Sequence, residues 1–265
     1  MSNIKINHCL VIVGQLRTLV VDKVKSRLKE ILSKYDGDVF FIIEKDDVSI
    51  KFDFSEFNPK DIKFYKYNGP SCDLTYLCSF GWYNCMELIL KHEQINNQKY
   101  DLIYKSRPDL YIQNDILNCP DISESDLNKA IVWGEYLGGG STKSIKYVKR
   151  LPQHISEIIM AAIDSQEKTF TYAHPHKHQR GLAICTGFNV MTRKACNIFF
   201  QEFLNELNKQ PVDPIFNLCP AHEEKLGYLL FKYNVEKRVV HINRMIARFN
   251  SNNYGDTLKD KILFD

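Results

Sequence analysis

The segment YDLIYKSRPD, residues 100–109, decides the fold class of this chain. Its stretch Leu102–Ser106 is mostly apolar. Pro108 cannot donate a hydrogen bond to a neighbouring strand, and it pushes Arg107 toward an extended conformation. We therefore predict a strand over 102–106 that carries Arg107 and Asp109 at its carboxyl end. In open α/β sheets, ligands bind beyond this end of the strands.

The residues before this segment alternate between strand and helix patterns. An apolar run over 8–13 ends at Gly14, a helical spacing of apolar residues follows over 21–32, and two further strand-like runs occupy 38–43 and 62–67. Such alternation is typical of a mainly parallel sheet. The sequence thus predicts an α/β, Rossmann-like sheet flanked by helices, in a single domain with two fused halves, 1–115 and 116–265.

The rest of the chain is less regular but continues both patterns. Helical spacing predicts helices over 82–95, 155–163 and 196–207, and a last helix after Pro220. Residues 131–133 and 238–242 read as strands, and residues 182–191 as a strand pair or one bent strand.

Composition narrows the function classes. The chain has 265 residues, of which 44% are hydrophobic and 25% charged, so it is able to bury a core. A net charge of +3 lacks the clustered basic excess that nucleic-acid binding requires. The eight cysteines contain no CxxC pair, which argues against a disulfide framework or a thiolate zinc site. Without a transmembrane or targeting segment in the sequence, a cytoplasmic location is expected.

Three residues in the predicted ligand edge have the chemistry of phosphate binding. Asp109 can hold a divalent cation that bridges a diphosphate, and Arg107 can pair with phosphate oxygens. Arg17 follows Gly14 and Gln15, where glycine permits close backbone approach and a guanidinium can reach a base or phosphate. The alternatives are a surface salt bridge that closes the strand and a solvated arginine that caps the next helix.

Four motifs together resemble a known protein family. They are Gly14-Gln15-Leu16-Arg17, the aromatic-led helix at Trp82-Tyr83, the segment over 100–109, and Pro-Ala-His-Glu-Glu over 220–224. Over about residues 8–244 the chain is similar to GT-A-like glycosyltransferases that use nucleotide sugars. Members of this family occur in bacterial capsule and lipopolysaccharide gene clusters and in large DNA viruses of the chlorovirus type.

The resemblance implies a reaction and a set of site residues. A hexosyl or pentosyl group would pass from a nucleoside-diphosphate sugar to a hydroxyl of a glycan acceptor, with the donor in 1–115 and the acceptor in 116–265. The donor would bind to Gly14, Gln15, Arg17, Lys105, Arg107 and Asp109.

The metal site departs from the family pattern. Where the family has Asp-x-Asp, this chain has Arg107-Pro108-Asp109. Asp109 could then hold Mn²⁺ or Mg²⁺, or cationic side chains could take over part of the metal's role. His241 is a further candidate ligand, with a buried hydrogen-bonded histidine as the alternative.

An inverting transferase needs a base on the acceptor side, and the helix after Pro220 is where the fold would place it. Glu223 is the candidate base and His222 its rival, whereas a first-turn carboxylate is also favoured by the helix dipole alone. The competing function is a non-catalytic nucleotide- or carbohydrate-binding module with a degenerate GT-A fold.

Overall fold

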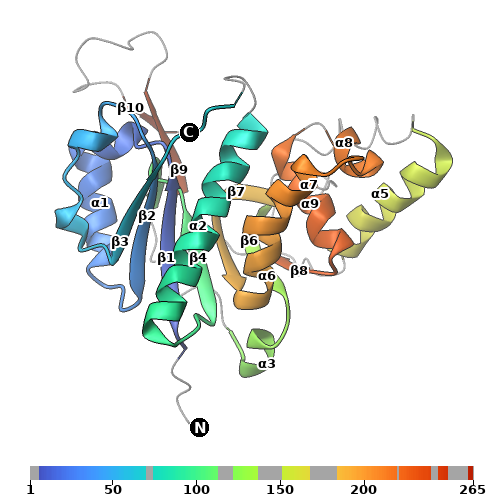
Figure 1. Ribbon diagram of the computed structural model, residues 1–265, viewed down its shortest axis with the longest axis horizontal. Helices are drawn as coiled ribbons and strands as arrows, with labels where there is room; N and C mark the ends of the chain where they lie inside the picture. Colours follow the sequence, from blue (N-terminus) through green and yellow to red (C-terminus); the bar gives the residue numbers. More distant parts are fainter. Residues whose placement is uncertain are drawn as a thin grey trace.

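The computed structural model describes residues 6–69, 74–112, 122–136, 151–167, 184–219, 221–239, 244–249 and 262–264. Its centre is a seven-stranded sheet in the order β3-β2-β1-β4-β7-β6-β8, and a three-stranded sheet in the order β10-β9-β5 lies beside it (Figure 1). In the described part of the chain, no helix combines the length and apolar character needed to span a membrane.

The large sheet is mainly parallel, as predicted. Only β7 runs against its two neighbours, β4 and β6, and all the other neighbouring pairs are parallel. Its strands are β1 (His8–Gly14), β2 (Asp38–Glu44), β3 (Asp61–Tyr65), β4 (Leu102–Ser106), β6 (Ile131–Tyr136), β7 (Ile184–Thr192) and β8 (Glu236–Val239). The strand predicted over 102–106 is thus confirmed to the residue.

Helices cover both faces of this sheet, which confirms the α/β fold class. The α-helices are α1 (Asp22–Leu32), α2 (Leu74–Asn96), α3 (Glu124–Leu127), α5 (Gln153–Glu167), α6 (Arg193–Asn197), α7 (Phe203–Asn208), α8 (Pro214–Leu218) and α9 (His222–Lys232). The shorter elements are the 3₁₀ helices η1 (Arg17–Val20), η2 (Ser49–Lys51) and η3 (Ser55–Phe57), and the π-helix η5 (Ile198–Glu202). The small sheet contains β5 (Leu110–Ile112), β9 (Arg244–Phe249) and β10 (Ile262–Phe264).

Alternate residues of β1 explain why both faces are covered. Cys9, Val11 and Val13 pack into the cluster formed with α2, α5, α6, η5, α7 and α9, whereas Leu10 and Ile12 pack into the cluster formed with η1, α1 and η3. A strand exposes successive side chains to opposite faces, so an apolar run without alternation requires two apolar environments. The run over 8–13 therefore becomes a central strand with a core on each side.

Some predicted boundaries differ from the observed ones. Helix α2 begins at Leu74, eight residues before the predicted start at Trp82. The pattern before Trp82 contains Gly81, which weakens a helix in isolation. In the fold this glycine lies close to β3, since a Cβ at Gly81 would lie 2.8 Å from the Tyr65 hydroxyl. Tertiary packing against β3 thus overrides the local helix propensity.

Lys237 is a buried lysine in the edge strand β8. Its side chain is directed into the protein, where Nζ donates to the carbonyl of Gly227 in α9 at 2.9 Å. Burial lowers the pKa of Lys237 to about 7. Between about pH 7 and the unfolded-state value near 10.4, the unfolded chain therefore binds a proton that the folded chain does not. This group makes the folded state less stable as the pH falls through that window.

Lys237→Met is expected to raise the free energy of unfolding at neutral pH by about 1–4 kcal/mol, since it removes a buried charge and keeps the volume. The gain should shrink as the pH rises from about 7 to about 10.4 and vanish above that value, where the wild-type lysine is neutral in the unfolded chain as well. Urea unfolding of both proteins at several pH values tests this. If the free energies of unfolding of the two proteins changed with pH in parallel, the lowered pKa of Lys237 would be contradicted.

Candidate active site

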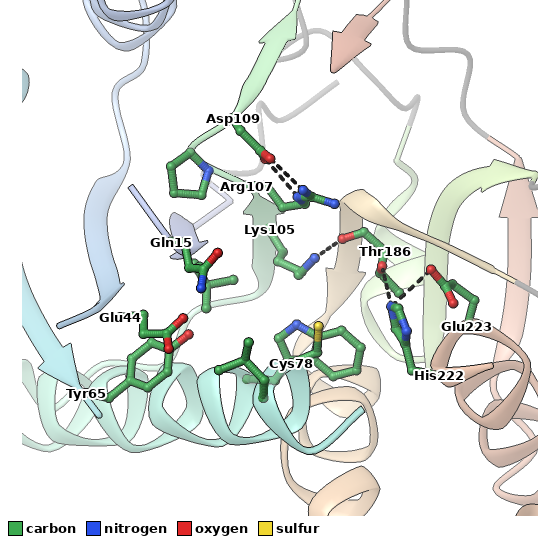
Figure 2. Close-up of a pocket in the computed structure, with 15 residues that line it drawn as sticks. Gln15, Glu44, Tyr65, Cys78, Lys105, Arg107, Asp109, Thr186, His222 and Glu223 are labelled. Atoms are coloured by element: carbon green, nitrogen blue, oxygen red, sulfur yellow. Dashed lines mark hydrogen bonds and ion pairs between the residues drawn. The ribbon is translucent and has the colours of Figure 1, made fainter. Parts of the chain in front are cut away.

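The sheet topology brings several strand ends to one edge. Strand β1 ends at Gly14, β2 at Glu44 and β4 at Ser106, and the three strands are parallel neighbours. Beyond this edge lies a cavity of about 200 Å³, lined by residues from these strands and from β3, α2, β7 and α9. Figure 2 shows Glu44 and Tyr65 at one end of the cavity and Thr186, His222 and Glu223 at the other, with Gln15 and Lys105 between them.

Arg107 and Asp109 form a two-pronged ion pair at the end of β4. Arg107 Nε donates to Asp109 Oδ1 at 2.8 Å, and Nη2 donates to Oδ2 at 2.6 Å (Figure 2). The Asp109 side chain is 3% exposed and that of Arg107 is 33% exposed. Two parallel hydrogen bonds of this kind fix the plane of the guanidinium group. The carboxylate therefore holds Arg107 in place, and Arg107 presents its remaining surface to the cavity.

Lys105 is almost fully buried at the floor of the same cavity. Its Nζ donates to the backbone carbonyl of Thr186 and lies 5.5 Å from the ring centroid of Trp82. A carbonyl oxygen and an aromatic face both stabilise an ammonium group. Lys105 in β4 and Arg107 directly after this strand thus place two cationic groups at the cavity.

His222 and Glu223 begin α9 on the opposite side of the cavity. His222 Nε2 lies 3.0 Å from Glu223 Oε1 and 3.4 Å from Thr186 Oγ1. Burial acts to raise the pKa of Glu223, but the hydrogen bond from His222, together with the charges of His222 and Arg107, lowers it overall. Glu223 is therefore ionised at neutral pH and able to accept a proton.

Glu224, the neighbour of Glu223, has a different role. Its Oε2 accepts from the backbone N–H of Ala221 at 3.4 Å, and the residue is 5% exposed. A carboxylate at the third position of a helix often caps the first turn in this way. The two first-turn carboxylates of α9 thus have different roles, since Glu224 caps the helix and Glu223 faces the cavity.

The remaining predicted donor residues lie near the end of β1. Gly14 has φ +137°, a backbone conformation that residues with a side chain rarely adopt. Gly14 and Gln15 both line the cavity. Arg17 is the first residue of η1, and its contact with a donor stays a prediction. His241 lies outside the described residues.

The cavity contains side chains that the sequence reasoning did not assign to a site. Glu44 and Tyr65 come from the ends of β2 and β3, Trp82 from α2, and Thr186 from β7. Glu44 had a usable signal, because it is a polar residue directly after the apolar run over 39–43, as Arg107 is after β4. Thr186 had none, since its place beside His222 depends on the pairing of β7 with β4.

The described side chains do not fit a resident divalent cation. Both oxygens of Asp109 already accept hydrogen bonds from Arg107. Across the described ranges, no group of three or more His, Cys, Asp or Glu side chains is arranged to hold a metal ion. A cation at Asp109 would have to displace the guanidinium from a nearly buried pair.

Comparisons with known proteins give only distant likenesses. No protein-family model and no curated protein matches this sequence. Among solved structures, the chain is similar to a glycosyltransferase involved in the glycosylation of the major capsid of PBCV-1, with a TM-score of 0.36, 12% identity and coverage of 89% of this chain and 82% of that chain. It is also similar to mouse xyloside xylosyltransferase 1 in the apo form, with a TM-score of 0.43, 9% identity and coverage of 89% and 85%. Likenesses of this size carry no argument about function.

Proposed function

We propose that this chain is a glycosyltransferase that moves a sugar from a nucleoside-diphosphate sugar to a hydroxyl of a glycan acceptor. The observation that carries the proposal is that one cavity is lined by two cationic side chains, Lys105 and Arg107, and by the carboxylate–imidazole pair of Glu223 and His222. The first pair suits a departing diphosphate and the second suits an attacking hydroxyl. The sequence motifs shared with GT-A-like glycosyltransferases support the same conclusion.

The proposed reaction is a single displacement at the anomeric carbon. The acceptor oxygen forms a bond to this carbon as the bond from the carbon to the diphosphate oxygen breaks. Glu223 takes the hydroxyl proton, and the electron pair leaves with the diphosphate. Arg107 and Lys105 stabilise the negative charge that develops on the leaving oxygen, where preorganised cations act most strongly in a water-poor site.

His222 keeps Glu223 in position for this step. Its Nε2 lies within hydrogen-bonding distance of the carboxylate, and the Thr186 hydroxyl lies near the same nitrogen. An imidazole fixed between a carboxylate and a hydroxyl has one preferred orientation. We therefore assign His222 as the positioning residue and Glu223 as the base. The pH dependence of kcat/KM tests this assignment against the reverse one.

The pairing of Arg107 with Asp109 leads to a prediction about metals. Because Arg107 occupies both carboxylate oxygens and supplies the positive charge itself, we expect transfer without a divalent cation. Activity in excess EDTA should equal that in Mn²⁺ or Mg²⁺. Loss of activity in EDTA, with recovery on addition of either ion, would contradict this expectation and return Asp109 to the role of metal ligand.

The same pairing is the observation that favours the competing function, a nucleotide-binding module without turnover. If Asp109 serves only to hold Arg107, the fold could bind a nucleotide and catalyse nothing. The two functions separate in one experiment, in which nucleotide binding and release of the nucleoside diphosphate from its sugar are measured on the same protein. Binding without release would favour the module.

A further inference from the structure

Glu44 is a cavity residue that the proposed reaction does not use. It is the last residue of β2, and its Oε2 is buried with no hydrogen-bond partner in the described part of the chain. Folded proteins satisfy nearly all buried polar atoms, so such an atom calls for an explanation. One explanation is a ligand that supplies the missing donor, since Glu44 lies in the cavity wall and not in the core (Figure 2).

The position of Glu44 is fixed by its neighbours. Its Cα is paired in register with that of Tyr65 on β3, and the next backbone N–H, that of Lys45, donates to the Tyr65 carbonyl at 2.7 Å. Tyr65 in turn packs its hydroxyl against Gly81 of α2. Burial, and then the nearby charge of Glu44, raises the pKa of Tyr65. The carboxylate is thus held at the cavity by strand pairing and packing.

The distance across the sheet selects the part of the donor that would reach Glu44. Strand β1 separates β2 from β4, so the ends of β2 and β4 are about 10 Å apart, or two strand spacings. With the diphosphate at Arg107 and Lys105, a nucleoside that extends over Gly14 and Gln15 would bring its ribose toward β2. A carboxylate repels phosphate but accepts hydrogen bonds from hydroxyl groups.

We propose that Glu44 accepts hydrogen bonds from the ribose hydroxyls of the donor nucleotide and makes the site selective for ribonucleotides. The inference rests on the proposed function, because it requires a nucleoside diphosphate in the cavity. The buried oxygen without a partner is then satisfied in the complex. In the free protein, leaving this oxygen without a partner lowers the stability of the fold, as is common where polar groups are preorganised to bind a ligand.

Calorimetric titration with UDP, GDP, CDP and ADP, and with the 2′-deoxy form of each nucleotide that binds, tests the proposal. The wild-type protein should prefer a ribonucleotide over its 2′-deoxy form by about tenfold or more, which is the effect of one charge-assisted hydrogen bond. In Glu44→Gln the preference should fall to about threefold or less. Glu87→Gln, at an exposed carboxylate on α2 that pairs with Lys63, is the matched control and should keep the wild-type preference.

Each other outcome contradicts the proposal in a distinct way. An unchanged preference in Glu44→Gln would overturn it, as would a change in the order among the four bases with no change in the 2′-deoxy ratio. If none of the four nucleotides binds the wild-type protein, the proposed function fails as well. Glu44→Gln should melt no lower than the wild type, because it removes a buried charge, so a loss of binding cannot be ascribed to unfolding.

Discussion

Glu223→Gln is expected to reduce turnover by about a hundredfold or more while the affinity for the donor stays unchanged. The substitution keeps the size of the side chain and one hydrogen-bond acceptor for His222, but it removes the charge that accepts the proton. A residue that acts only in the transition state affects kcat and kcat/KM equally. Steady-state kinetics together with donor titration measure both quantities.

Glu224→Gln is the matched control for this substitution. It makes the same chemical change one residue along the same helix turn, at a side chain that caps the backbone of Ala221. Glutamine also caps at this position, so stability and turnover should stay close to wild type. Equal losses in the two variants would show that the first turn of α9 has been disturbed, and near-normal turnover in Glu223→Gln would exclude Glu223 as the base.

The pH dependence of kcat/KM separates Glu223 from His222. The hydrogen bond from His222 holds the pKa of Glu223 below its usual range, so a carboxylate base stays ionised through neutral pH and loses activity only in acid. The rate should therefore be flat between about pH 6 and pH 8, apart from the contributions of the substrates. A histidine base in general titrates near neutrality, and a fall in rate between about pH 7 and pH 6 would reassign the base to His222.

Arg107→Ala is expected to weaken donor binding by about 1.5–3 kcal/mol, or roughly tenfold to 150-fold in Kd. The contact of the guanidinium with the diphosphate should strengthen as negative charge develops on the leaving oxygen in the transition state, so kcat should fall as well. Arg107→Lys keeps the charge but loses the fork that Asp109 holds. We expect it to recover only part of the affinity, which isothermal titration with the donor can measure.

The control for Arg107 is Arg27→Ala, at an arginine of α1 that pairs with Glu30. This variant should bind the donor as the wild type does. Because Arg107→Ala leaves the nearly buried Asp109 carboxylate without its main partner, some loss of stability is expected, and Arg107→Ala/Asp109→Asn should restore part of it. Wild-type donor affinity in Arg107→Ala would show that the arginine serves only to close the strand.

Sequence patterns predicted the sheet well, because its signals are local. The bounds of β4 follow from an apolar run closed by Pro108, and those of β1 from an apolar run closed by Gly14. Helix α2 was predicted too short, because its first turns depend on contacts that sequence spacing does not contain, including that of Gly81 with Tyr65. Helix propensity predicts the ends of a helix poorly where tertiary packing stabilises its first turns.

The site was predicted less completely than the sheet. Arg107 and Asp109 were expected at the strand end, but their mutual pairing depends on side-chain geometry, and this pairing changes the expected role of the metal. Glu223 and Glu224 could not be told apart by the helix dipole, which favours both. Capping geometry distinguishes them, since the third helical position is the one that reaches back to the backbone.

The most direct test of the central claim is the release of nucleoside diphosphate from a panel of nucleotide sugars by the purified chain. The panel should include UDP-, GDP-, ADP- and TDP-linked sugars, each with and without EDTA, and Glu223→Gln should be measured beside the wild type. We predict release from at least one nucleoside-diphosphate donor, independent of EDTA and strongly reduced in Glu223→Gln. Nucleotide binding with no release from any donor, or release that Glu223→Gln leaves intact, would contradict the account.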